Sequence, residues 1–541
     1  MSWKSRLAYL VGLVFASSCG RAQLPPLGSS DTNVLTVTAP RVVREFRFKG
    51  NTVFSDLELA RICGSYTNRP INSLDLEEVR VQLTLGYVNK GYVSSGAVLE
   101  DQNIGEGWVL FRIVEGRLTD IRLQGNRWLR PSFYRARLLA HGGDPLNVNE
   151  IRNTLQVWRD VYPLDLVNAD IQPGAVPGEA VMNLKVKERF PYHLGVQYAN
   201  SKPPSTGAEQ VDTLVRVDSL TGHADPLSFD YGLARGKDAG MQRPEFLALD
   251  DLSAAYSLPV TASDTRVGGS YSRNSAAIVE YPFDQLDIRS RMEVYGVTLS
   301  QPLLRNPSRE FSLSLTAERR SSRSYLLGTP YSFSPGAVNG RSVESVVRFA
   351  GQFVDRSPRH SVAARLVLNA GFDVLGATRH EDEPDGRFVS LLGQVQYVRR
   401  VGKTHNEVLL RLAGQYSPDP LLSLEQLAIG GASTVRGYRE NTMIRDQGVV
   451  ATAEFRVPIW MGKEERAILQ LAPFADFGAG WDQSDPVPFD NLGSVGVGVL
   501  ISPCKTVNAS LYWGHALRHL DYRTRSLQDD GIHFSLTVWA F

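Results

Sequence analysis

Two patterns of hydrophobic and polar residues divide this chain. Up to residue 189, short alternating segments are separated by stretches in which apolar residues recur every three or four positions, as they do on one face of an α-helix. From Phe190 onward the helical period largely disappears, and alternating segments follow one another. The first pattern predicts α+β structure, and the second predicts a large region of β-strands.

The first region contains an internal repeat. The segments "FRFKGNTVF" at Phe46–Phe54 and "IRLQGNRWL" at Ile121–Leu129 lie about 75 residues apart. Each alternates like a β-strand and contains Gly-Asn, which is a turn signal. Helical patterns follow both copies, and a further strand closes each one. The sequence therefore predicts two tandem α+β modules, at residues 44–116 and 117–189.

Helical faces support these modules. In the first module the apolar face is formed by Leu76, Val79, Leu83 and Tyr87. Asp75 with Glu78 fits a capping box, and Gly91 fits the end of the helix. In the second module the face is repeated by Ile151, Leu155 and Trp158.

The second region has the alternation of a membrane barrel. "FSLSLTAE", which begins at Phe311, places four apolar residues on one face and four polar residues on the other. This is typical of an antiparallel transmembrane β-barrel with lipid outside and polar groups inside. At roughly 22 residues per strand and connection, residues 190–541 accommodate about 16 strands. A large soluble β-sandwich has the same alternation and is the alternative.

The first 22 residues have the form of a secretory signal peptide. Lys4 and Arg6 precede an apolar stretch at Leu7–Ala16, and small residues lead to a cleavage site before Gln23. The apolar stretch is too short to cross a membrane as a helix. Lipid attachment at Cys19 is an alternative. The sequence thus predicts an exported protein.

Composition limits the chemistry. The chain has 58 Lys and Arg against 57 Asp and Glu, a formal net charge of +1, which argues against nucleic acid as a partner. The three cysteines lack the spacing of a metal site, and Cys63 and Cys504 are expected to be buried. The sequence has no phosphate-binding G-x-x-x-x-G-K-[ST] motif. We therefore expect no cofactor and no metal.

Two polar clusters are candidates for catalysis or metal binding. His515, His519 and Asp521 are close in "GHALRHLDY", but four residues of extended strand span roughly 13 Å, too far for both histidines to hold one metal. The acidic cluster at residues 381–385 has no calcium-loop spacing and predicts a solvated loop. Because no serine elbow or metal triad accompanies them, we expect no enzyme. A barrel enzyme such as a surface protease or lipase is the alternative.

The most specific segment is "LAIGGASTVRGYREN", with Gly430, Gly431 and the tip Val435–Tyr438. Gly-Gly followed by Val-Arg-Gly-Tyr resembles a motif of the two-partner secretion outer-membrane transporters (TpsB family), which include haemolysin activators and filamentous haemagglutinin exporters. The N-terminal modules, the first ending in "VLFRIVEG", resemble the polypeptide-transport-associated (POTRA) domains of these proteins. The resemblance covers essentially the whole mature chain.

This resemblance implies where the motif lies. In such transporters it forms the tip of a loop folded into the barrel lumen, here around residues 427–445. A second motif, Phe-x-Asp on an inward-facing strand, matches Phe474 and Asp476 in "PFADFGAGW". The resemblance implies that Arg436 pairs with Asp476, and such a pair can form two charge-assisted hydrogen bonds. Gly430, Gly431 and Gly437 allow the backbone to turn tightly. Tyr438 adds a ring with a polar end, and Val435 completes the tip motif.

The function that the resemblance implies is protein export across the outer membrane. The POTRA domains, in the periplasm, would capture a secreted TpsA-type partner by β-augmentation, and the barrel would export it without nucleotide hydrolysis. Outer-membrane lipids are expected partners, as is the barrel assembly machinery through the C-terminal Phe541. The alternative within the superfamily is an insertase that assembles other barrels. A passive porin would leave the N-terminal modules unexplained.

The chain departs from well-known members of the family before its first module. Those members carry a helix that plugs the pore, joined by a linker to the first POTRA domain. Here residues 23–43 contain three prolines and are too short and too poor in helix formers for both parts. We expect the plug to be absent or vestigial and the inward loop to occlude the pore.

Overall fold

The computed structural model describes residues 40–102, 107–234, 249–381, 384–402, 405–463, 466–483, 490–522 and 524–540. The predicted signal peptide, Cys19 and nearly all of the segment 23–43 lie outside these ranges. Phe541 and part of the acidic cluster also lie outside them. What the sequence predicts for these residues therefore stays a prediction.

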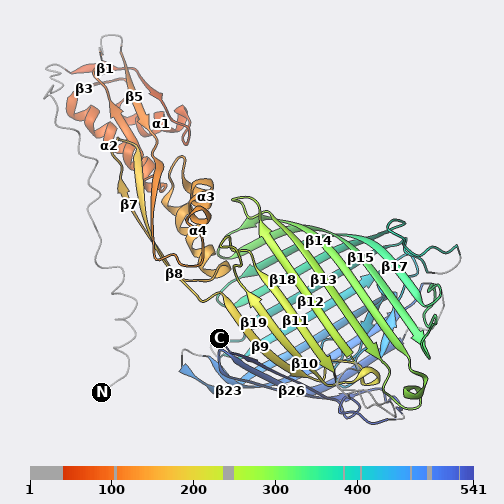
Figure 1. Cartoon of the computed structure of the whole chain (residues 1–541). Helices are drawn as coiled ribbons and strands as arrows, with labels where there is room; N and C mark the ends of the chain where they lie inside the picture. The colour runs from red at the N-terminus through yellow and green to blue at the C-terminus, as the bar shows by residue number, and fades with distance from the viewer. Residues whose placement is uncertain are drawn as a thin grey trace, which may run out of the picture. The chain divides into compact units, whose positions relative to one another are not determined.

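The first module combines a three-stranded sheet with two helices (Figure 1). Strand β5 lies between β2, which is parallel to it, and β4, which is antiparallel. The predicted face of α2 packs against the inner side of this sheet, where Val109 and Phe111 are fully buried. The elements are β1 (Arg41–Val43), β2 (Glu45–Lys49), α1 (Asp56–Ile62), β3 (Arg69–Ile71), α2 (Ser73–Asn89), β4 (Gly96–Leu99) and β5 (Trp108–Val114).

The start of α2 differs from the prediction. Its N-cap is Asn72, whose side chain accepts hydrogen bonds from the amides of Leu74 and Asp75, while Asp75 accepts one from the Asn72 amide. The predicted box of Asp75 with Glu78 was wrong, because Asp75 is already the third residue of the helix. Both pairs have the spacing of a capping box, and the extended backbone at Asn72 selects the earlier one.

The second module has a similar order of elements. Strand β8 lies between β6 and β7 and pairs in parallel with β6. The rings of Phe133, Trp158 and Tyr162 pack on one another. No helix in the described part of the chain is long and apolar enough to cross a membrane. The elements are β6 (Arg117–Gln124), α3 (Pro131–Gly142), α4 (Val148–Val161), β7 (Leu164–Pro173) and β8 (Glu179–Glu188).

Both modules form the Gly-Asn turn in the same way. Gly50 has φ 93° and Gly125 has φ 89°, a region that favours glycine. A Cβ on Gly50 would lie 2.5 Å from the carbonyl oxygen of Ile113, and one on Gly125 would lie 2.1 Å from that of Val186. Glycine thus lets each turn approach the closing strand of its module, β5 or β8.

A glutamate at the closing strand of each module fixes this turn. Glu115 accepts hydrogen bonds from the amides of Thr52 (2.7 Å) and Val53 (2.9 Å) and from the hydroxyl of Tyr87 (2.9 Å). The sequence repeat is therefore also a repeat of one hydrogen-bonded turn. The equivalent bonds of the second module run to Glu188 from the Arg127 amide (2.9 Å), the Leu129 amide (3.2 Å) and the Tyr134 hydroxyl (2.7 Å).

In the described part of the chain, sixteen long strands close into an antiparallel barrel, which confirms the predicted architecture (Figure 1). The ring closes where β27 pairs with β9, from Ser535↔Ala199 to Trp539↔Gly195. A two-residue strand, β16 (Thr329–Pro330), turns back and pairs antiparallel with the end of β15. The strands are β9 (Tyr192–Ala199), β10 (Gln210–Val217), β11 (Leu227–Ala234), β12 (Leu249–Pro259), β13 (Arg266–Ala277), β14 (Arg289–Arg305), β15 (Arg309–Leu326), β17 (Arg341–Arg356), β18 (His360–Phe372), β19 (Val389–Arg400), β20 (Glu407–Tyr416), β23 (Gln447–Met461), β24 (Ala467–Trp481), β25 (Asp490–Cys504), β26 (Val507–Ala516) and β27 (Ile532–Trp539).

The two faces of the barrel wall follow the predicted alternation. Outward positions carry exposed apolar side chains such as Leu315, Val497 and Leu536. Inward positions carry polar side chains that are buried, such as Asp476 and His533. An apolar outer face and a polar inner face are what a barrel in lipid requires.

The two ends of the barrel differ in their connections. At one end, which we call the turn end, strands are joined by short turns such as 306–308 and 505–506. At the other end, which we call the loop end, connections are longer and include 278–288 and 517–531. Strand β9 begins and β27 finishes at the turn end.

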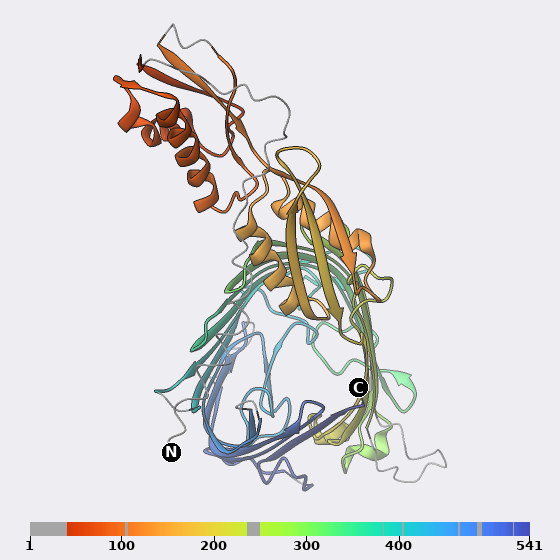
Figure 2. The ribbon, with the colours of Figure 1, turned by 90° about the vertical axis from the view of Figure 1, so that its left-hand side faces the viewer.

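One connection of the loop end turns back into the barrel. This lumen loop, residues 417–446, joins β20 to β23 and contains a small hairpin of β21 (Leu427–Ile429) and β22 (Met443–Arg445). Figure 2 shows light-blue segments of this region inside the ring of strands. Apolar packing holds the hairpin to the inner wall, through Ile429, Val435, Tyr438, Met443, Val450 and Leu492.

Candidate functional site

Three glycines shape the tip of the lumen loop. Gly430, Gly431 and Gly437 have φ values of 110°, 104° and 95°, which side chains rarely allow. A Cβ on Gly437 would lie 2.9 Å from the carbonyl oxygen of Gly514 on β26. The backbone of the tip therefore lies directly against the backbone of the barrel wall.

Arg436 at the tip binds Asp476 on β24 through a two-pronged fork. Its Nε donates to Asp476 Oδ2 and its Nη2 donates to Oδ1, both at 2.8 Å. The Arg436 amide donates a third hydrogen bond to Oδ2 at 3.0 Å. The side chains are 4 % and 0 % exposed, so solvent competes little for these bonds. A bidentate arginine–carboxylate pair fixes both distance and orientation.

A second carboxylate and two rings complete the surroundings of Arg436. Its Nη1 donates to Glu454 Oε2 on β23 at 2.6 Å. The guanidinium lies 3.6 Å from the ring centre of Phe474 and 4.6 Å from that of Tyr512. Aromatic faces attract cations, most strongly where water is excluded. Three strands of the wall, β23, β24 and β26, thus contribute to one arginine site.

The residues beside Arg436 are also fixed to the wall. The Gly437 amide donates to His533 Nε2 on β27 at 3.4 Å. The Tyr438 hydroxyl donates to the carbonyl oxygen of Gly493 at 3.0 Å and accepts from the Arg518 amide at 3.1 Å. Val435 is fully buried. The tip is therefore held by a backbone hydrogen bond of Gly437, by the hydroxyl of Tyr438 and by the ion pairs of Arg436.

Arg439 links the tip to two connections of the loop end. Its Nη2 donates to Asp529 Oδ2 at 2.8 Å, in the connection between β26 and β27. Its Nη1 donates to Glu280 Oε1 at 2.8 Å, in the connection between β13 and β14. The guanidinium also lies 4.0 Å from the ring centre of Tyr522. One side chain thus joins three segments that are far apart in the sequence.

Arg436 and Arg439 anchor the lumen loop at its tip, and Glu425 anchors it before the hairpin. Glu425 accepts hydrogen bonds from Arg320 on β15 and from Arg348 on β17, the latter at 2.9 Å from Nη1 to Oε2. Its side chain is 4 % exposed. The lumen loop is therefore fixed to β15 and β17 before its tip and to β23, β24 and β26 at its tip.

Glu440, a carboxyl of the tip, has a strongly shifted pKa. Burial raises the pKa of its carboxyl to about 7, although the hydrogen bond from the Ala432 amide and the charge of Lys202 oppose the rise. That amide donates to Oε1 at 2.6 Å. The Glu440 amide donates to Gln528 of the loop end at 2.9 Å. The packing of this carboxyl at the tip is thus sensitive to pH near neutrality.

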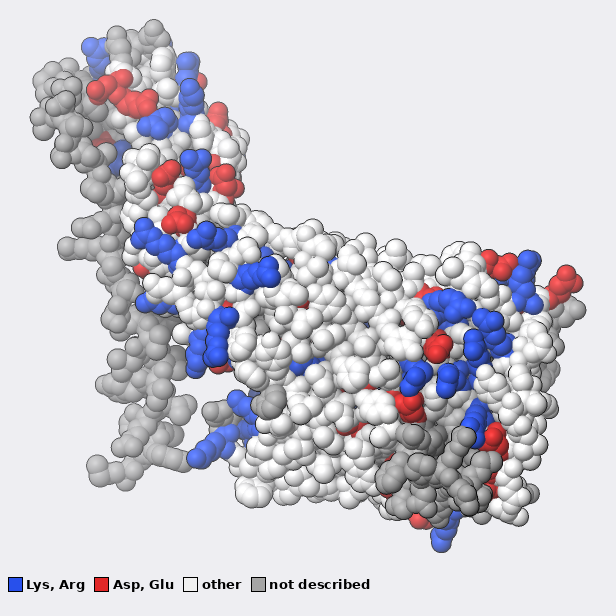
Figure 3. Space-filling view, viewed as in Figure 1, with Lys and Arg blue, Asp and Glu red and all other residues white. Residues whose placement is uncertain are grey.

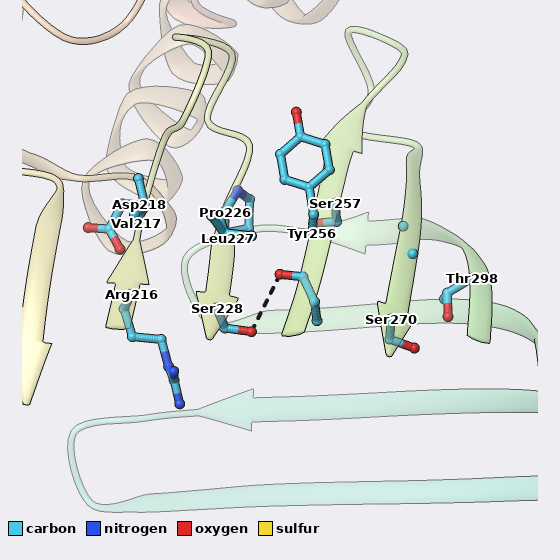
Figure 4. Close-up of a pocket in the computed structure, with 13 residues that line it drawn as sticks. Arg216, Val217, Asp218, Pro226, Leu227, Ser228, Tyr256, Ser257, Ser270 and Thr298 are labelled. Atoms are coloured by element: carbon cyan, nitrogen blue, oxygen red, sulfur yellow. Dashed lines mark hydrogen bonds between the residues drawn. The ribbon is translucent and has the colours of Figure 1, made fainter. Parts of the chain in front are cut away.

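A cavity of about 280 Å³ lies along β10–β14 near the turn end (Figure 4). Its lining includes the small side chains Ser228, Ser270 and Thr298, while Arg216 and Tyr256 point in opposite directions. No histidine is among the residues that line it, so the serines there have no nucleophile–base pair. Within the described ranges, no group of three His, Cys, Asp or Glu could hold a metal ion.

The histidine cluster lies at the surface, whereas Asp385 of the acidic cluster is buried. His519 and Asp521 are hydrogen-bonded at 3.0 Å, with side chains 88 % and 98 % exposed, beyond the end of β26 that carries His515. Cys63 is buried, as expected, but Cys504 is exposed at the turn end of β25. The expectation for Cys504 was wrong because burial there depends on the turn and not on the apolar character of cysteine.

The structure brings together the residues that the motifs selected. Arg436, Phe474 and Asp476 are in contact, and the glycines turn the loop as their positions suggested. Sequence reasoning missed the partners of the tip on the wall and in the loop-end connections, among them Glu454, Tyr512, His533, Asp529 and Glu280. Glu454 offered one signal, a charged residue at an inward position of an alternating strand.

Comparison with known proteins gives two family matches. The profile of the family described as haemolysin secretion/activation protein ShlB/FhaC/HecB matches residues 178–501. The profile described as POTRA domain, ShlB-type, matches residues 42–116. The first match covers more than half of the chain.

Individual relatives and a solved structure agree with these matches. The outer membrane transporter CdiB of Dickeya dadantii (strain 3937) is 26% identical over 430 residues, which cover 77% of this chain and 72% of that protein. The hemolysin transporter protein ShlB of Serratia marcescens is 24% identical over 409 residues, which cover 74% of this chain and 69% of that protein. The structure of CdiB from Escherichia coli superposes with a TM-score of 0.70 at 22% identity, covering 94% of this chain and 92% of that one.

Proposed function

Because the chain belongs to the haemolysin secretion/activation family described as ShlB/FhaC/HecB, we propose that it is an outer-membrane translocase of two-partner secretion. It takes a secreted partner protein from the periplasm and exports it through the barrel lumen. The turn end of the barrel faces the periplasm and the loop end faces outward, as in other barrels of the outer membrane. The two N-terminal modules act as periplasmic POTRA domains.

The buried fork between Arg436 and Asp476 is the observation that carries this proposal. A barrel of 16 strands leaves a lumen that side chains of its wall cannot fill, and the lumen loop lies inside it (Figure 2). The tip is held by directional ion pairs and hydrogen bonds. Such contacts can break and re-form without any covalent step. We assign Arg436 the role of setting the position of the lumen loop, with no catalytic role.

The cargo is proposed to bind the POTRA domains as an extended chain. In each three-stranded sheet two strands lie at an edge, β2 and β4 in the first module and β6 and β7 in the second. Free edges offer backbone donors and acceptors to an additional strand. The ten residues of β7 (Leu164–Pro173) make it the longest of these edges, and Leu166 on it is 55% exposed. The cargo class we propose is a secreted protein of the TpsA type.

Two further partners are part of the proposal. The exposed apolar residues of the outer wall contact membrane lipids. The C-terminal Phe541 is proposed to be read by the barrel assembly machinery before insertion. Export itself needs no nucleotide, because folding of the cargo outside the cell can make the net movement favourable.

A secretion experiment tests the function. Cells would carry the wild-type chain, no chain, or the Arg436→Ala variant at equal barrel abundance, together with a candidate cargo. We expect one or a few large secreted or surface proteins to disappear without the chain and to fall at least about tenfold in the variant, since breaking a buried ion pair costs about 3–5 kcal/mol.

Arg379→Ala provides a matched control. This arginine lies at the same end of the barrel, with a side chain 64 % exposed and a single ion pair to Asp373. We expect it to leave secretion unchanged. Depletion of many outer-membrane barrels without the chain would instead point to an insertase, and unchanged surface proteins in all strains would refute export.

A further inference from the structure

Three arginines form a row across the outer wall at the loop end. Arg291 on β14 is directly opposite Arg323 on β15, and Arg323 is directly opposite Arg341 on β17. All three are exposed. The same face of β14 carries Tyr295 and Val297, which are 50% and 62% exposed. The row therefore points outward, away from the lumen.

Three like charges side by side lower the stability of the sheet unless an anion neutralises them. Like charges directly opposite on neighbouring strands destabilise a sheet. Among the described residues, no carboxylate lies within 4.0 Å of a guanidinium of the row. Glu293 shares this outer face but is opposite Ser321 and Arg273. Among the described residues, three charges thus lie side by side without an ion pair to a carboxylate, and Glu293 lies on the same face one cross-strand pair away.

The neighbouring arginines are already paired. Arg273 binds Asp250 at 2.6 Å, and Arg289 binds Asp287 at 2.6 Å. Arg319 donates to the carbonyl oxygen of Leu375 at 3.2 Å. Among the described arginines of this part of the outer wall, the guanidiniums without a protein partner are therefore those of the row itself, which we call the arginine row: Arg291, Arg323 and Arg341.

The position of the arginine row along the barrel axis can be compared with the expected position of the membrane surface. Along β14, Arg291 is followed toward the turn end by Tyr295, Val297 and Leu299, all exposed on the outer face. Aromatic residues at the edge of an apolar band mark the membrane interface in barrels. The row thus lies beyond the interface, on the side of the loop end. Figure 3 shows Lys and Arg side chains gathered at that end of the outer wall.

We propose that the arginine row binds phosphate groups of lipid headgroups in the outer leaflet, a site that rests on the outer-membrane location and not on the identity of the cargo. Neighbouring strands are about 4.8 Å apart, so two adjacent guanidiniums can bracket one phosphate and three can engage two. Guanidinium matches phosphate in charge and in geometry. A cargo chain inside the lumen cannot reach this face. The occupant is therefore a headgroup such as that of lipid A, with two phosphates.

The test uses the full-length chain in nanodiscs of phosphatidylcholine with added bisphosphorylated lipid A. Bound lipid is counted by native mass spectrometry, and the midpoint of thermal unfolding is followed in parallel. The variant is R291Q/R323Q/R341Q. The matched control is R309Q/R359Q/R399Q, which removes three exposed arginines at the turn end.

We expect the row variant to bind lipid A on the order of 100-fold more weakly, since each basic residue at a charged membrane surface contributes a factor of about five. The control is expected to bind as the wild type does. The unfolding midpoint gives a second sign. Without lipid A the row variant should be at least as stable as the wild type, because it lacks the repulsion of the row, and with lipid A it should be less stable.

Three results would overturn the proposal. They are equal binding by the row variant and the wild type, equal loss in the control, and displacement of lipid A by millimolar inorganic phosphate, which would indicate a site for free anions. None of these readouts involves secretion. Failure of this proposal is therefore distinguishable from failure of the proposed export function.

Discussion

At the scale of single residues, the loop tip depends on one buried cation shared by two carboxylates. Asp476 receives three hydrogen bonds from Arg436, whereas Glu454 receives one and is also bound by Arg456 at 2.7 Å. The two acids are therefore unequal. Asp476 sets the position of the tip, and Glu454 balances the charges of two arginines.

This inequality predicts different effects of two conservative substitutions. Asp476→Asn removes the fork and should favour the undocked tip by about 3 kcal/mol or more, while Glu454→Gln should have a smaller effect. The measurement is hydrogen exchange of the amides of 430–441 in the full chain in nanodiscs. Because both acids share one arginine, the effect of the double variant on tip docking should be smaller than the sum of the effects of the two single variants. Equal exchange rates in the two single variants would contradict this account.

The pH response of the tip is a second prediction for single residues. The pKa of Glu440 is raised by burial to about 7 from an ordinary value of 4.5. A group with a raised pKa stabilises the docked tip below the ordinary value, and this contribution is lost as the pH rises through about 7. The open probability of single channels in planar bilayers should therefore increase between pH 5 and pH 8.

Glu440→Gln isolates this effect. Glutamine keeps an oxygen that can accept from the Ala432 amide but does not titrate, so its channels should lose most of the pH dependence. An unaltered pH profile in this variant would show that another group is responsible.

At the scale of elements, the two N-terminal modules share one turn. In each, a glycine with positive φ approaches the closing strand, and a glutamate accepts the amides that follow. Burial raises the pKa of Glu115, but the hydrogen bonds from Thr52 and Val53 outweigh it, so the pKa is lowered overall. Its stabilisation is therefore present above about pH 4.5 and lost as the pH falls further.

Glu115→Gln should loosen this turn. We expect a loss of about 1–2 kcal/mol in local stability, since a carboxylate with several donors is replaced by a neutral group with one acceptor oxygen. The readout is amide exchange at Thr52 and Val53 at pH 7. Glu100→Gln in the same module is the control, because Glu100 is 54% exposed and binds only Arg112 at the surface. Slow exchange at both amides in the Glu115 variant would refute the role of the carboxylate.

At the scale of the whole molecule, three anchors hold the lumen loop across the barrel. Glu425 binds β15 and β17, Arg436 binds β23 and β24, and Arg439 binds two connections of the loop end. These contacts join the lumen loop to segments between Glu280 and Asp529 that are far apart in the sequence. A loop fixed at three places can occlude a wide lumen, while the position of its tip still depends on Arg436.

The loop as a whole should therefore control conductance. Replacing residues 430–442 with Asn-Gly, a short hairpin turn, leaves β21 and β22 in place and removes the tip. We expect single-channel conductance to rise several-fold, because barrels of this size have a water-filled channel when nothing fills it. Conductance equal to that of the wild type would mean that the tip does not close the pore.

Much of this protein follows from local sequence. The strand alternation, the repeat of modules and the helical faces are read from residues close together in the chain, because burial acts on every second or every third to fourth position. The motifs around Arg436 and Asp476 were recognised by their resemblance to those of a known family. Alternation and chain length yielded the fold class and the approximate number of strands, while the tip residues came from the family resemblance.

Tertiary structure decided what depends on register and on long-range contact. Glu454, Tyr512 and His533 reach the tip only because their strands are neighbours in the closed ring, and Arg439 meets Glu280 and Asp529 only after the loop turns inward. The arginine row is likewise invisible in the sequence, where its members are separated by 32 and 18 positions. Alternation determines which face a side chain occupies, but only the pairing of strands determines which side chains become neighbours.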